Sequence, residues 1–392
     1  MTLDPIDQRL GAHVTADELL GLAWLLDDSN TVATGAIGHL DAARTAPVRT
    51  DTIFRISSMT KPLTAVAASI LIEDGIIDPA EPVDRLLPEL ADRQVLTHPA
   101  AEITDTVAAR RPITIDDLLT FRLGWGMDFT DFSPKPFTAA CAELGLGAGP
   151  PTPAEMPPPD IWLARLGTLP LQFQPGERWL YHVGSAILGI LIARAAGKPL
   201  SQFLAERVLD PLGMSDTGFS VAPGKLDRFG PHFVEVDGER VVFDPVDGQW
   251  SSPPAFEGGG DGLVSTLADY HRFARMLTGG GELDGTRILS ERSVAAITTN
   301  HLTAEQIARG GPEPDGSAGW GHGVGVQLTD RPDGPRAGAY GWAGGLGSSW
   351  TNDGPVTAIL LTNQMWNSAG PLPVFATFEQ ILGERSRLSG GV

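Results

Sequence analysis

The sequence predicts an α+β fold in which an antiparallel sheet, flanked by helices, is joined to a largely helical second domain. Segments with β patterns lie near both ends of the chain and helical patterns fill its middle, so the two ends are expected to build one sheet. With 42% apolar and 19% charged residues among 392, the chain can bury a large core. This composition excludes a disordered or fibrous protein. We expect the sheet domain to comprise residues 1–75 and 220–392, and the helical domain residues 76–219.

The N-terminal third predicts a hairpin followed by two helices. Apolar runs at residues 20–26 and 31–37 flank the turn residues 27–30, which is the pattern of two paired strands. Residues 58–75 carry apolar side chains at helical spacing and end in a glycine, and a second helix is predicted over residues 115–120.

The middle of the chain predicts a long irregular segment and then a third helix. Residues 123–160 contain the proline clusters 149–153 and 157–159, where we expect neither a helix nor an inner strand. Long loops of this kind often form lids or pocket walls. A helix over residues 185–196 follows, with Gly197 as its stop.

The C-terminal part predicts further strands and a last helix. β patterns at residues 338–342 and 348–352 flank glycines, and Asn352-Asp353-Gly354 is a strong hairpin turn into residues 356–362. An amphipathic helix is predicted over residues 374–382. The chain has no repeat at a fixed period, which argues against solenoids and propellers.

Charge and composition limit the possible partners. The chain has 28 basic and 48 acidic residues, a net charge of −20, so nucleic acid and anionic membrane surfaces would be repelled. The longest apolar run, residues 183–193, is shorter than the roughly 20 residues that span a bilayer, and no secretory signal pattern is present at the N-terminus. We therefore expect a cytoplasmic protein that acts on a small molecule; its oligomeric state stays open.

Metal and disulfide chemistry find no support in the sequence. The single cysteine, Cys141, cannot form an internal disulfide and excludes a cysteine zinc cluster. The eight histidines show no metal-binding spacing. The chain also lacks the G-x-S-x-G of α/β-hydrolases, and its nearest approach to a dinucleotide motif, residues 258–266, predicts a tight turn before a helix.

Ser58 and Lys61 are the first candidates for chemistry. Ser58 lies where a β-patterned segment turns into a helix, and Lys61 follows one turn later on the same face, within reach of the Ser58 hydroxyl. A helix N-terminus stabilises an alkoxide, and a buried lysine can lose its proton near neutral pH and act as a base. An N-cap serine followed by a solvated lysine is the alternative. However, the chain has only four lysines, and this is its only S-x-x-K.

Tyr181 is the second candidate. It is one of three tyrosines and directly precedes the third predicted helix. An ammonium group nearby would stabilise the phenolate, so we expect the pKa of Tyr181 to fall toward that of a useful base. A buried structural tyrosine is the alternative. We expect the neighbouring His182 side chain to point elsewhere.

The third candidate is the glycine-rich segment that begins at Trp342. Glycines beside a strand end let a substrate approach the backbone and leave an amide free to donate. A bulged strand is the alternative.

Taken in order, Ser58-x-x-Lys61, Tyr181-x-Val183 and Trp342-Ala343-Gly344 resemble the three motifs of the serine β-lactamase and penicillin-binding-protein superfamily. The chain is most similar to class C β-lactamases and family VIII carboxylesterases, over residues 10–385. Further similar segments are residues 54–62, 118–120, 175–177, 210–214 and 259–269.

This resemblance implies a β-lactamase/transpeptidase-like fold with the active site between the two domains. It implies that Ser58 is the nucleophile, that Lys61 and Tyr181 form its base system, and that the amides of Ser58 and Gly345 form the oxyanion hole. The residues implied to contact the substrate are Trp342, Ala343, Gly344 and Val183. No metal or organic cofactor is implied.

Two departures from the motifs indicate the substrate. Where β-lactamases and D,D-peptidases usually have an asparagine, this chain has Val183, and where they have a lysine or histidine, it has Trp342. A tryptophan carries no charge for a substrate carboxylate, and W-x-G also occurs among family VIII esterases. The sequence therefore predicts a carboxylesterase for short-chain or neutral esters.

Three other functions share the same catalytic residues. The chain could be an amide hydrolase of the β-lactamase, D,D-peptidase or D-aminopeptidase type, or an acyltransferase on the same scaffold. A penicillin-recognising sensor that is acylated once without turnover is the alternative from outside the enzymes.

Overall fold

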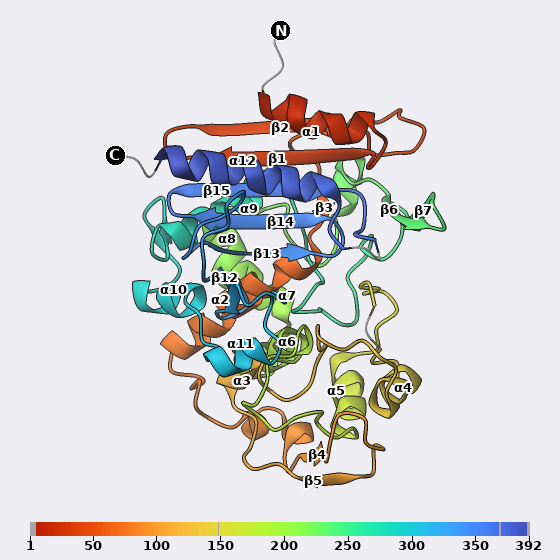
Figure 1. Ribbon diagram of the computed structural model, residues 1–392, viewed down its shortest axis with the longest axis vertical. Coiled ribbons are helices and arrows are strands. Elements are labelled where there is room, and N and C mark those ends of the chain that lie inside the picture. Colours follow the sequence, from red (N-terminus) through yellow and green to blue (C-terminus); the bar gives the residue numbers. More distant parts are fainter. Residues whose placement is uncertain (1–4, 148, 368–369, 390–392) are drawn as a thin grey trace.

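A seven-stranded antiparallel sheet organises the molecule, with the strand order β11-β12-β13-β14-β15-β1-β2. The computed structural model describes residues 5–147, 149–367 and 370–389. The sheet consists of β1 (Gly21–Asp27), β2 (Val32–Gly38), β11 (Ala318–Trp320), β12 (Gly325–Gln327), β13 (Tyr340–Gly344), β14 (Ser348–Asp353) and β15 (Val356–Thr362). Strands from near both ends of the chain therefore share one sheet, and the predicted α+β class is confirmed (Figure 1).

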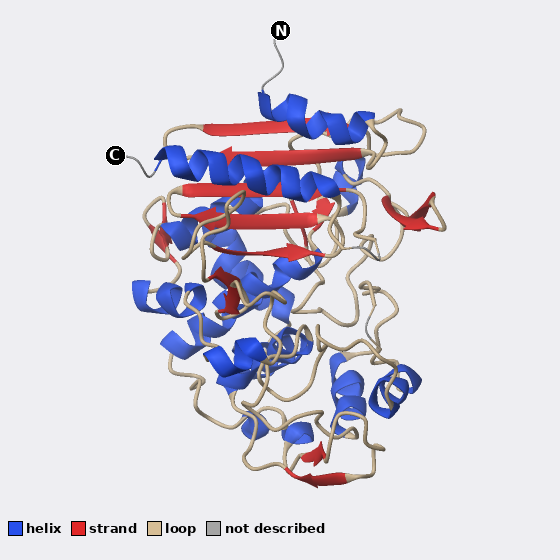
Figure 2. Ribbon diagram, viewed as in Figure 1, coloured by secondary structure: helices blue, strands red, loops and turns tan. Residues whose placement is uncertain are grey.

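Helices cover both faces of this sheet. α1 (Pro5–Thr15) and α12 (Pro373–Ser389) lie side by side on one face, and α9 (Leu267–Thr278) packs against β1 and β15 on the other (Figures 1 and 2). Every residue of β1 is buried, which explains why its apolar run is continuous instead of alternating. Leu22 and Trp24 contribute to the core under α1 and α12, while Ala23 and Leu25 contribute to the main core.

The two predicted hairpins are confirmed. β1 pairs with β2 from Gly21↔Gly38 to Asp27↔Val32, and β14 pairs with β15 around the turn at Gly354, whose φ is +59°. A glycine is favoured there because L residues rarely adopt this backbone conformation. α12 is longer than the predicted helix, and it begins at a proline, which the first turn of a helix tolerates.

The remaining elements are short or belong to the helical part of the molecule. The other α-helices are α2 (Thr60–Glu73), α3 (Ile115–Leu119), α4 (Pro136–Glu143), α5 (Pro159–Gly167), α6 (Val183–Ala196), α7 (Leu200–Leu204), α8 (Asp210–Leu212), α10 (Glu291–Thr298) and α11 (Ala304–Ala308). Two-stranded sheets are formed by β3 (Phe54–Arg55) with β8 (Val264–Ser265), β4 (Gln94–Leu96) with β5 (Thr106–Ala108), β6 (His232–Val236) with β7 (Glu239–Asp244), and β9 (Glu282–Leu283) with β10 (Thr286–Arg287). Short 3-10 helices are η1 (Ser57–Met59), η2 (Val83–Arg85), η3 (Pro88–Leu90) and η5 (Pro223–Arg228), and η4 (Ala205–Leu209) is a short π-helix.

The expectation of an irregular segment over residues 123–160 is partly wrong. α4 lies inside it, and α5 begins at Pro159, within the second proline cluster. Both helices have a proline in the first turn, where the missing N–H has no helical partner in any case. The prolines therefore start these helices instead of preventing them. Residue 148 lies outside the described residues.

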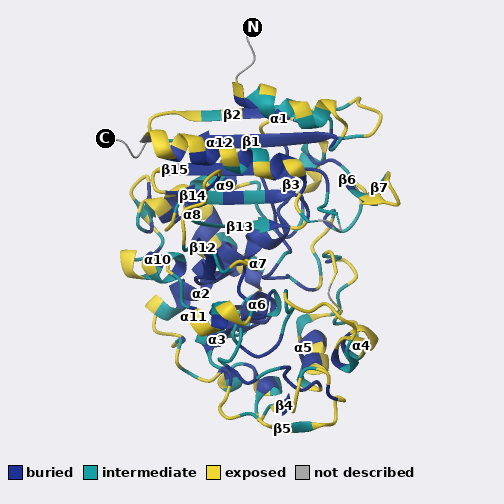
Figure 3. Cartoon of the chain, viewed as in Figure 1, coloured by how far each residue is buried: buried dark blue, intermediate teal, exposed yellow. Residues whose placement is uncertain are grey.

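α2 and α6 pack against each other at the centre of the molecule, and both are almost completely buried (Figures 1 and 3). Gly197 ends α6 with a φ of +65°, as the sequence predicts. No single described helix is long and apolar enough to cross a membrane; α6 and the segment Leu200–Leu212 meet that test only together, and they are bent by 78°. The domain boundaries stay a prediction, and their ends at residues 1–4 and 390–392 lie outside the described residues.

Candidate active site

The segment that carries Ser58 leaves a short strand and enters a helix through a sharp turn. β3 pairs with β8, and the Ile56 amide donates to the Leu263 carbonyl at 3.1 Å. The backbone then turns at Ser57, whose φ is +44°. Ser58 lies in η1, directly before α2, and is buried except for 7% of its surface. The serine therefore lies at the N-terminal end of α2, and a small part of its surface is exposed.

A buried ion pair anchors this segment from behind. Arg55 Nη2 lies 2.5 Å from Asp244 Oδ2, and the two side chains are 2% and 1% exposed. The guanidinium also donates to the Gly230 carbonyl at 2.9 Å and stacks 3.9 Å from the centre of the Phe229 ring. Burial lowers the pKa of Arg55 to about 10, so it stays charged at neutral pH.

Lys61 makes the contact with Ser58 that the sequence predicts. Its Nζ lies 2.8 Å from Ser58 Oγ and 2.7 Å from the Gly260 carbonyl oxygen. The Lys61 side chain is completely buried, and this burial lowers its pKa from 10.5 to about 7, against an opposing attraction from Asp261. The neutral amine is therefore accessible near neutral pH.

Tyr181 also reaches this site, but its acidity is the opposite of what the sequence predicts. Burial raises the pKa of Tyr181 well above its ordinary value, although hydrogen bonds with Ser58 and Trp342 act to lower it. Lys61 Nζ lies over the ring, 4.7 Å from its centre. Because the lysine is itself only partly charged, it does not stabilise a phenolate. The expected lowering of the Tyr181 pKa is therefore wrong, and the hydroxyl stays protonated.

An aromatic cluster holds Tyr181 in place. The cluster consists of Phe121, Trp179, Tyr181, Leu302 and Trp320. The Phe121 ring meets the Tyr181 ring edge-on, with centroids 5.9 Å apart. Aromatic pairs favour this geometry. The backbone of Tyr181 exchanges two hydrogen bonds with Met127, at 2.8 and 3.0 Å.

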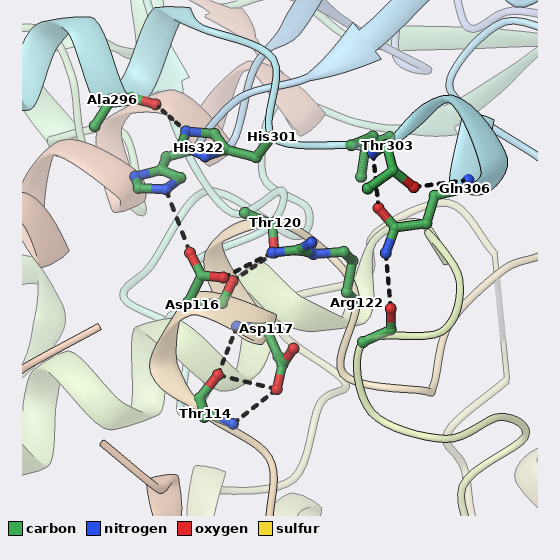
Figure 4. Close-up of polar contacts among 12 residues, drawn as sticks. Thr114, Asp116, Asp117, Thr120, Arg122, Ala296, His301, Thr303, Gln306 and His322 are labelled. Atoms are coloured by element: carbon green, nitrogen blue, oxygen red, sulfur yellow. Dashed lines mark hydrogen bonds and ion pairs between the residues drawn. The ribbon is translucent and has the colours of Figure 1, made fainter. Parts of the chain in front are cut away.

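A polar network supports the far side of this cluster (Figure 4). Arg122 Nη2 donates to Asp116 Oδ2 at 2.7 Å, across the turn that places Phe121 at a φ of +58°. His322 lies 3.8 Å from the other Asp116 oxygen and stacks on His301, with ring centroids 4.4 Å apart. These contacts join α3 to the segment between α10 and α11. Their role is structural, because none of them reaches Lys61 or Ser58.

Trp342 contacts Tyr181 directly. Its indole Nε1 donates to the Tyr181 hydroxyl oxygen at 2.6 Å, and the two rings lie 5.4 Å apart. The indole N–H of Trp342 is thus used by the tyrosine. Successive side chains of a strand alternate in direction, so Ala343 lies on the opposite face of β13 from Trp342.

The end of β13 adjoins the nucleophile segment. A Cβ atom at Gly344 would lie 2.5 Å from the Ile56 carbonyl oxygen and 3.1 Å from Ser57 Cβ. Only a glycine permits this close approach. Gly345 follows at an exposed position where an added Cβ would meet no atom within 4 Å. The amide proposed for the oxyanion hole therefore belongs to a residue beside open space, next to the Ser57–Ser58 backbone.

His182 points toward Lys61, contrary to the expectation from the sequence. Its backbone has φ +85° and ψ −60°, and the Val183 amide donates to the Tyr181 carbonyl at 3.2 Å. This is a γ-turn of the rare positive-φ form. Such backbone strain costs of order 1–3 kcal/mol and is typically found at functional sites. The turn brings His182 Nδ1 to 3.3 Å from Lys61 Nζ.

A glycine segment between β7 and β8 completes the surroundings of Lys61. Thr64 Oγ1 donates to the Gly259 carbonyl at 2.7 Å, Gly260 accepts from Lys61, and Asp261 Oδ2 lies 3.6 Å from His182 Nε2. A Cβ at Gly259 would lie 2.7 Å from the Ser185 carbonyl of α6. Sequence reasoning did not identify Gly260 or Asp261 as site residues. The three consecutive glycines before a lone aspartate were the available signal.

A cavity of about 670 Å³ adjoins the site at His182, Val183 and Asp261. Its outer wall is formed by residues from 125 to 156, so this segment is the pocket wall that the sequence predicts. Its lining includes the aromatic side chains of Trp125, Phe137, Trp162 and Phe256. Cys141 also lines the cavity, but burial raises the pKa of its thiol to about 11, so it is not a nucleophile at neutral pH.

Among the described residues, no group of three or more His, Cys, Asp or Glu side chains could hold a metal ion. The chemistry that the arrangement supports is nucleophilic. A serine hydroxyl contacts a partly neutral amine, a protonated phenol stands beside both, and an open cavity lies next to them.

Comparisons with known proteins give the family of this chain. The Beta-lactamase family model matches residues 6–371. Protein Rv1367c of Mycobacterium tuberculosis (strain ATCC 25618 / H37Rv) is 37% identical over 332 residues, 83% of this chain and 80% of that protein. Esterase EstB of Burkholderia gladioli is 29% identical over 364 residues, 86% of this chain and 84% of that protein.

A solved structure shows the same fold. A mutant of simvastatin synthase (LovD) from Aspergillus terreus has a TM-score of 0.78 at 24% identity, over 98% of this chain and 95% of that chain. The sheet, the helices and the match along the chain lead to one conclusion. This protein belongs to the Beta-lactamase family and has the serine β-lactamase and penicillin-binding-protein fold.

Proposed function

We propose that this protein is a carboxylesterase that cleaves neutral esters, including short-chain ones, through an acyl intermediate on Ser58. The contact of Ser58 Oγ with Lys61 Nζ at 2.8 Å supports the nucleophile and its base. The similarity to Esterase EstB, at 29% identity, supports the reaction class. We propose the cytoplasm as the location.

The proposed roles follow from the protonation states. The neutral amine of Lys61 accepts the Ser58 proton while Oγ attacks the ester carbonyl. The amides of Ser58 and Gly345 face the developing oxyanion. The leaving alcohol receives the proton from Lys61, with the Tyr181 hydroxyl as a relay, and the same groups then activate the water that releases the acid. Tyr181 acts as a protonated donor throughout, because burial keeps its pKa high.

The lack of a free cation among the described lining residues of the cavity favours a neutral substrate. Among its described lining residues, the one lysine, Lys135, is paired with Asp131 at 3.0 Å. Burial and the nearby Lys61 lower the pKa of His182 to about 3, so it is neutral at pH 7. Asp128 is paired with Arg178 at 3.2 Å, and burial raises the pKa of Asp261 against the opposing attraction of Lys61. Among the described lining residues, a substrate carboxylate would therefore find no cation free to bind it.

The size of the cavity extends the range of acyl groups. A volume of about 670 Å³ lies in the range of pockets that enclose drug-sized ligands, roughly 300–1,000 Å³. The aromatic side chains that line the cavity favour acyl groups that are apolar and larger than a butyryl chain. We therefore expect p-nitrophenyl octanoate to be cleaved with a kcat/KM at least equal to that of the butyrate.

A paired assay tests the proposal. Wild-type protein is compared on p-nitrophenyl butyrate and on nitrocefin, with Ser58→Ala as the inactive variant. Ser69→Ala is the matched control, because Ser69 is a buried serine of α2 whose hydroxyl only donates to the Ala65 carbonyl. We expect fast ester cleavage, weak nitrocefin turnover and no activity in Ser58→Ala, while Ser69→Ala behaves like the wild type.

Other outcomes would replace the proposal. Preferred turnover of nitrocefin would indicate an amide hydrolase. A single burst without steady turnover would indicate a sensor, and faster acylation of an added alcohol than of water would indicate an acyltransferase. Near-native activity of Ser58→Ala would refute the assignment of the nucleophile.

A further inference from the structure

Two groups besides the serine lie within hydrogen-bond distance of Lys61 Nζ. The carbonyl oxygen of Gly260, at 2.7 Å, can only accept. His182 Nδ1, at 3.3 Å, accepts or donates according to the tautomer of its ring. A neutral amine has two N–H donors and one lone pair. The protonation of His182 therefore decides where the Lys61 lone pair points.

The position of Asp261 favours one of the two tautomers. Its Oδ2 lies 3.6 Å from His182 Nε2, and a carboxylate oxygen attracts the side of the imidazole that bears the proton. With the proton on Nε2, Nδ1 presents its lone pair to Lys61. The alternative tautomer would place an N–H of His182 against the amine and a bare nitrogen against the carboxylate. The pKa of His182, lowered to about 3, excludes the doubly protonated ring at neutral pH.

We propose that His182, held in its Nε2–H tautomer by Asp261, orients the Lys61 amine so that its lone pair faces Ser58 Oγ. His182 is a positioning residue, and this role rests on the esterase mechanism proposed above. The two N–H groups of the neutral amine go to Gly260 O and His182 Nδ1. The one remaining direction at nitrogen, the lone pair, is then directed at the serine hydroxyl 2.8 Å away.

The backbone supports this assignment. The positive-φ turn at His182 is the feature that directs its ring back to Lys61, and the following residue, Val183, offers no polar side-chain atom. The ring also packs over the glycine segment, since a Cβ at Gly260 would lie 3.5 Å from His182 Cε1. A strained turn that serves only to connect Tyr181 to α6 would not need an imidazole at its centre.

The orientation serves both halves of the acylation step. The Ser58 proton passes to the Lys61 lone pair as the Oγ–carbon bond forms, which leaves an ammonium group and a tetrahedral oxyanion. The new N–H points at the reacting centre, because the other two remain bound to Gly260 and His182. When the carbon–oxygen bond to the alcohol breaks, this proton goes to the leaving oxygen and the amine returns to its neutral form.

Three titratable groups face Lys61 among the described residues: Tyr181 under its Nζ, His182, and Asp261. A hydrogen bond to Nδ1 favours the charged form of the lysine, since the ammonium donates more strongly than the amine. Removing that acceptor should lower the Lys61 pKa further while it misdirects the lone pair. The kcat would then fall and the acid limb of the pH profile would move to lower pH. Simple destabilisation of the fold would not move the acid limb.

The test compares His182→Leu with His182→Asn. The two replacements are nearly the same size, but only asparagine keeps an acceptor near the position of Nδ1, and it also tolerates positive φ. We expect His182→Leu to lower kcat by 10- to 100-fold with KM changed by less than threefold, and to move the acid limb of kcat to lower pH. We expect His182→Asn to recover most of the wild-type kcat. Thermal midpoints of both variants within a few degrees of the wild type show that the fold is kept.

A second measurement separates this inference from the proposed function. The rate at which a fluorophosphonate probe labels Ser58 reports the reactivity of the serine without requiring an ester substrate. Slower labelling of His182→Leu than of the wild type and of His182→Asn supports the positioning role even if no ester is turned over, a result that would refute the esterase proposal alone. Wild-type rates and an unchanged acid limb in His182→Leu, or equal losses in both variants, would overturn the inference. A wild type that is not labelled at all would overturn both.

Discussion

Replacing Lys61 by methionine tests the energetic cost of the buried amine. Methionine has a similar length and no charge, and the Lys61 side chain is completely buried. Burial lowers the pKa of Lys61 from 10.5 to about 7. Since each pKa unit corresponds to about 1.4 kcal/mol, the unfavourable contribution at pH 7 is about 4 kcal/mol relative to a lysine of ordinary pKa.

The pH dependence of this contribution has a definite sign. The unfolded chain keeps a proton on Lys61 up to about pH 10.5, whereas the folded chain keeps it only up to about pH 7. The destabilisation is therefore complete below pH 7 and disappears as the pH rises toward 10.5. Methionine would remove it but would leave Gly260 O and His182 Nδ1 without their donor, at about 1 kcal/mol each.

The net expectation is that Lys61→Met is inactive but more stable by about 2 kcal/mol at pH 7. With an unfolding entropy of about 2.1 cal/mol/K per residue over 392 residues, the Tm should rise by about 2–3 °C. Thermal unfolding at pH 7 and pH 10 measures both the gain and its decline. Lys198→Met is the control, because Lys198 is 32% exposed and pairs with Glu206 at the surface. A Lys61→Met protein no more stable than the wild type at pH 7, or equally stabilised at both pH values, would refute the reasoning.

Two further predictions concern activity. The acid limb of kcat/KM for ester cleavage should lie near pH 7, and the rate should fall about tenfold per pH unit below it, because Lys61 must be neutral to accept the Ser58 proton. Asp261→Asn should move this limb to lower pH, since the carboxylate raises the Lys61 pKa. An acid limb that stays in place would contradict the coupling between the two residues. Trp342→Phe removes the indole donor 2.6 Å from the Tyr181 hydroxyl. It should lower kcat by about tenfold, which corresponds to the loss of one hydrogen bond. An unchanged kcat in steady-state kinetics would show that this contact does not support catalysis.

Much of the fold and part of the site follow from local patterns. The hairpin at Asn352-Asp353-Gly354 was predictable because a turn of two residues depends on its own backbone preferences. The contact between Ser58 and Lys61 was predictable for a similar reason, since a separation of three residues at the start of a helix places both on one face. α4 and α5 were missed because their prolines, which usually end helices, here occupy first turns.

The sequence by itself predicted Ser58 as the nucleophile and its contact with Lys61, and it determined the lack of a cation at Trp342, because these depend on residue type and short spacing. Only the tertiary structure decided the protonation of Tyr181 and the direction of His182. Burial among aromatic rings set the first, and a strained turn between Tyr181 and α6 set the second. Asp261, about 80 residues further along the chain, meets His182 only after folding. Desolvation and long-range contacts depend on which segments pack together, and no local pattern records that.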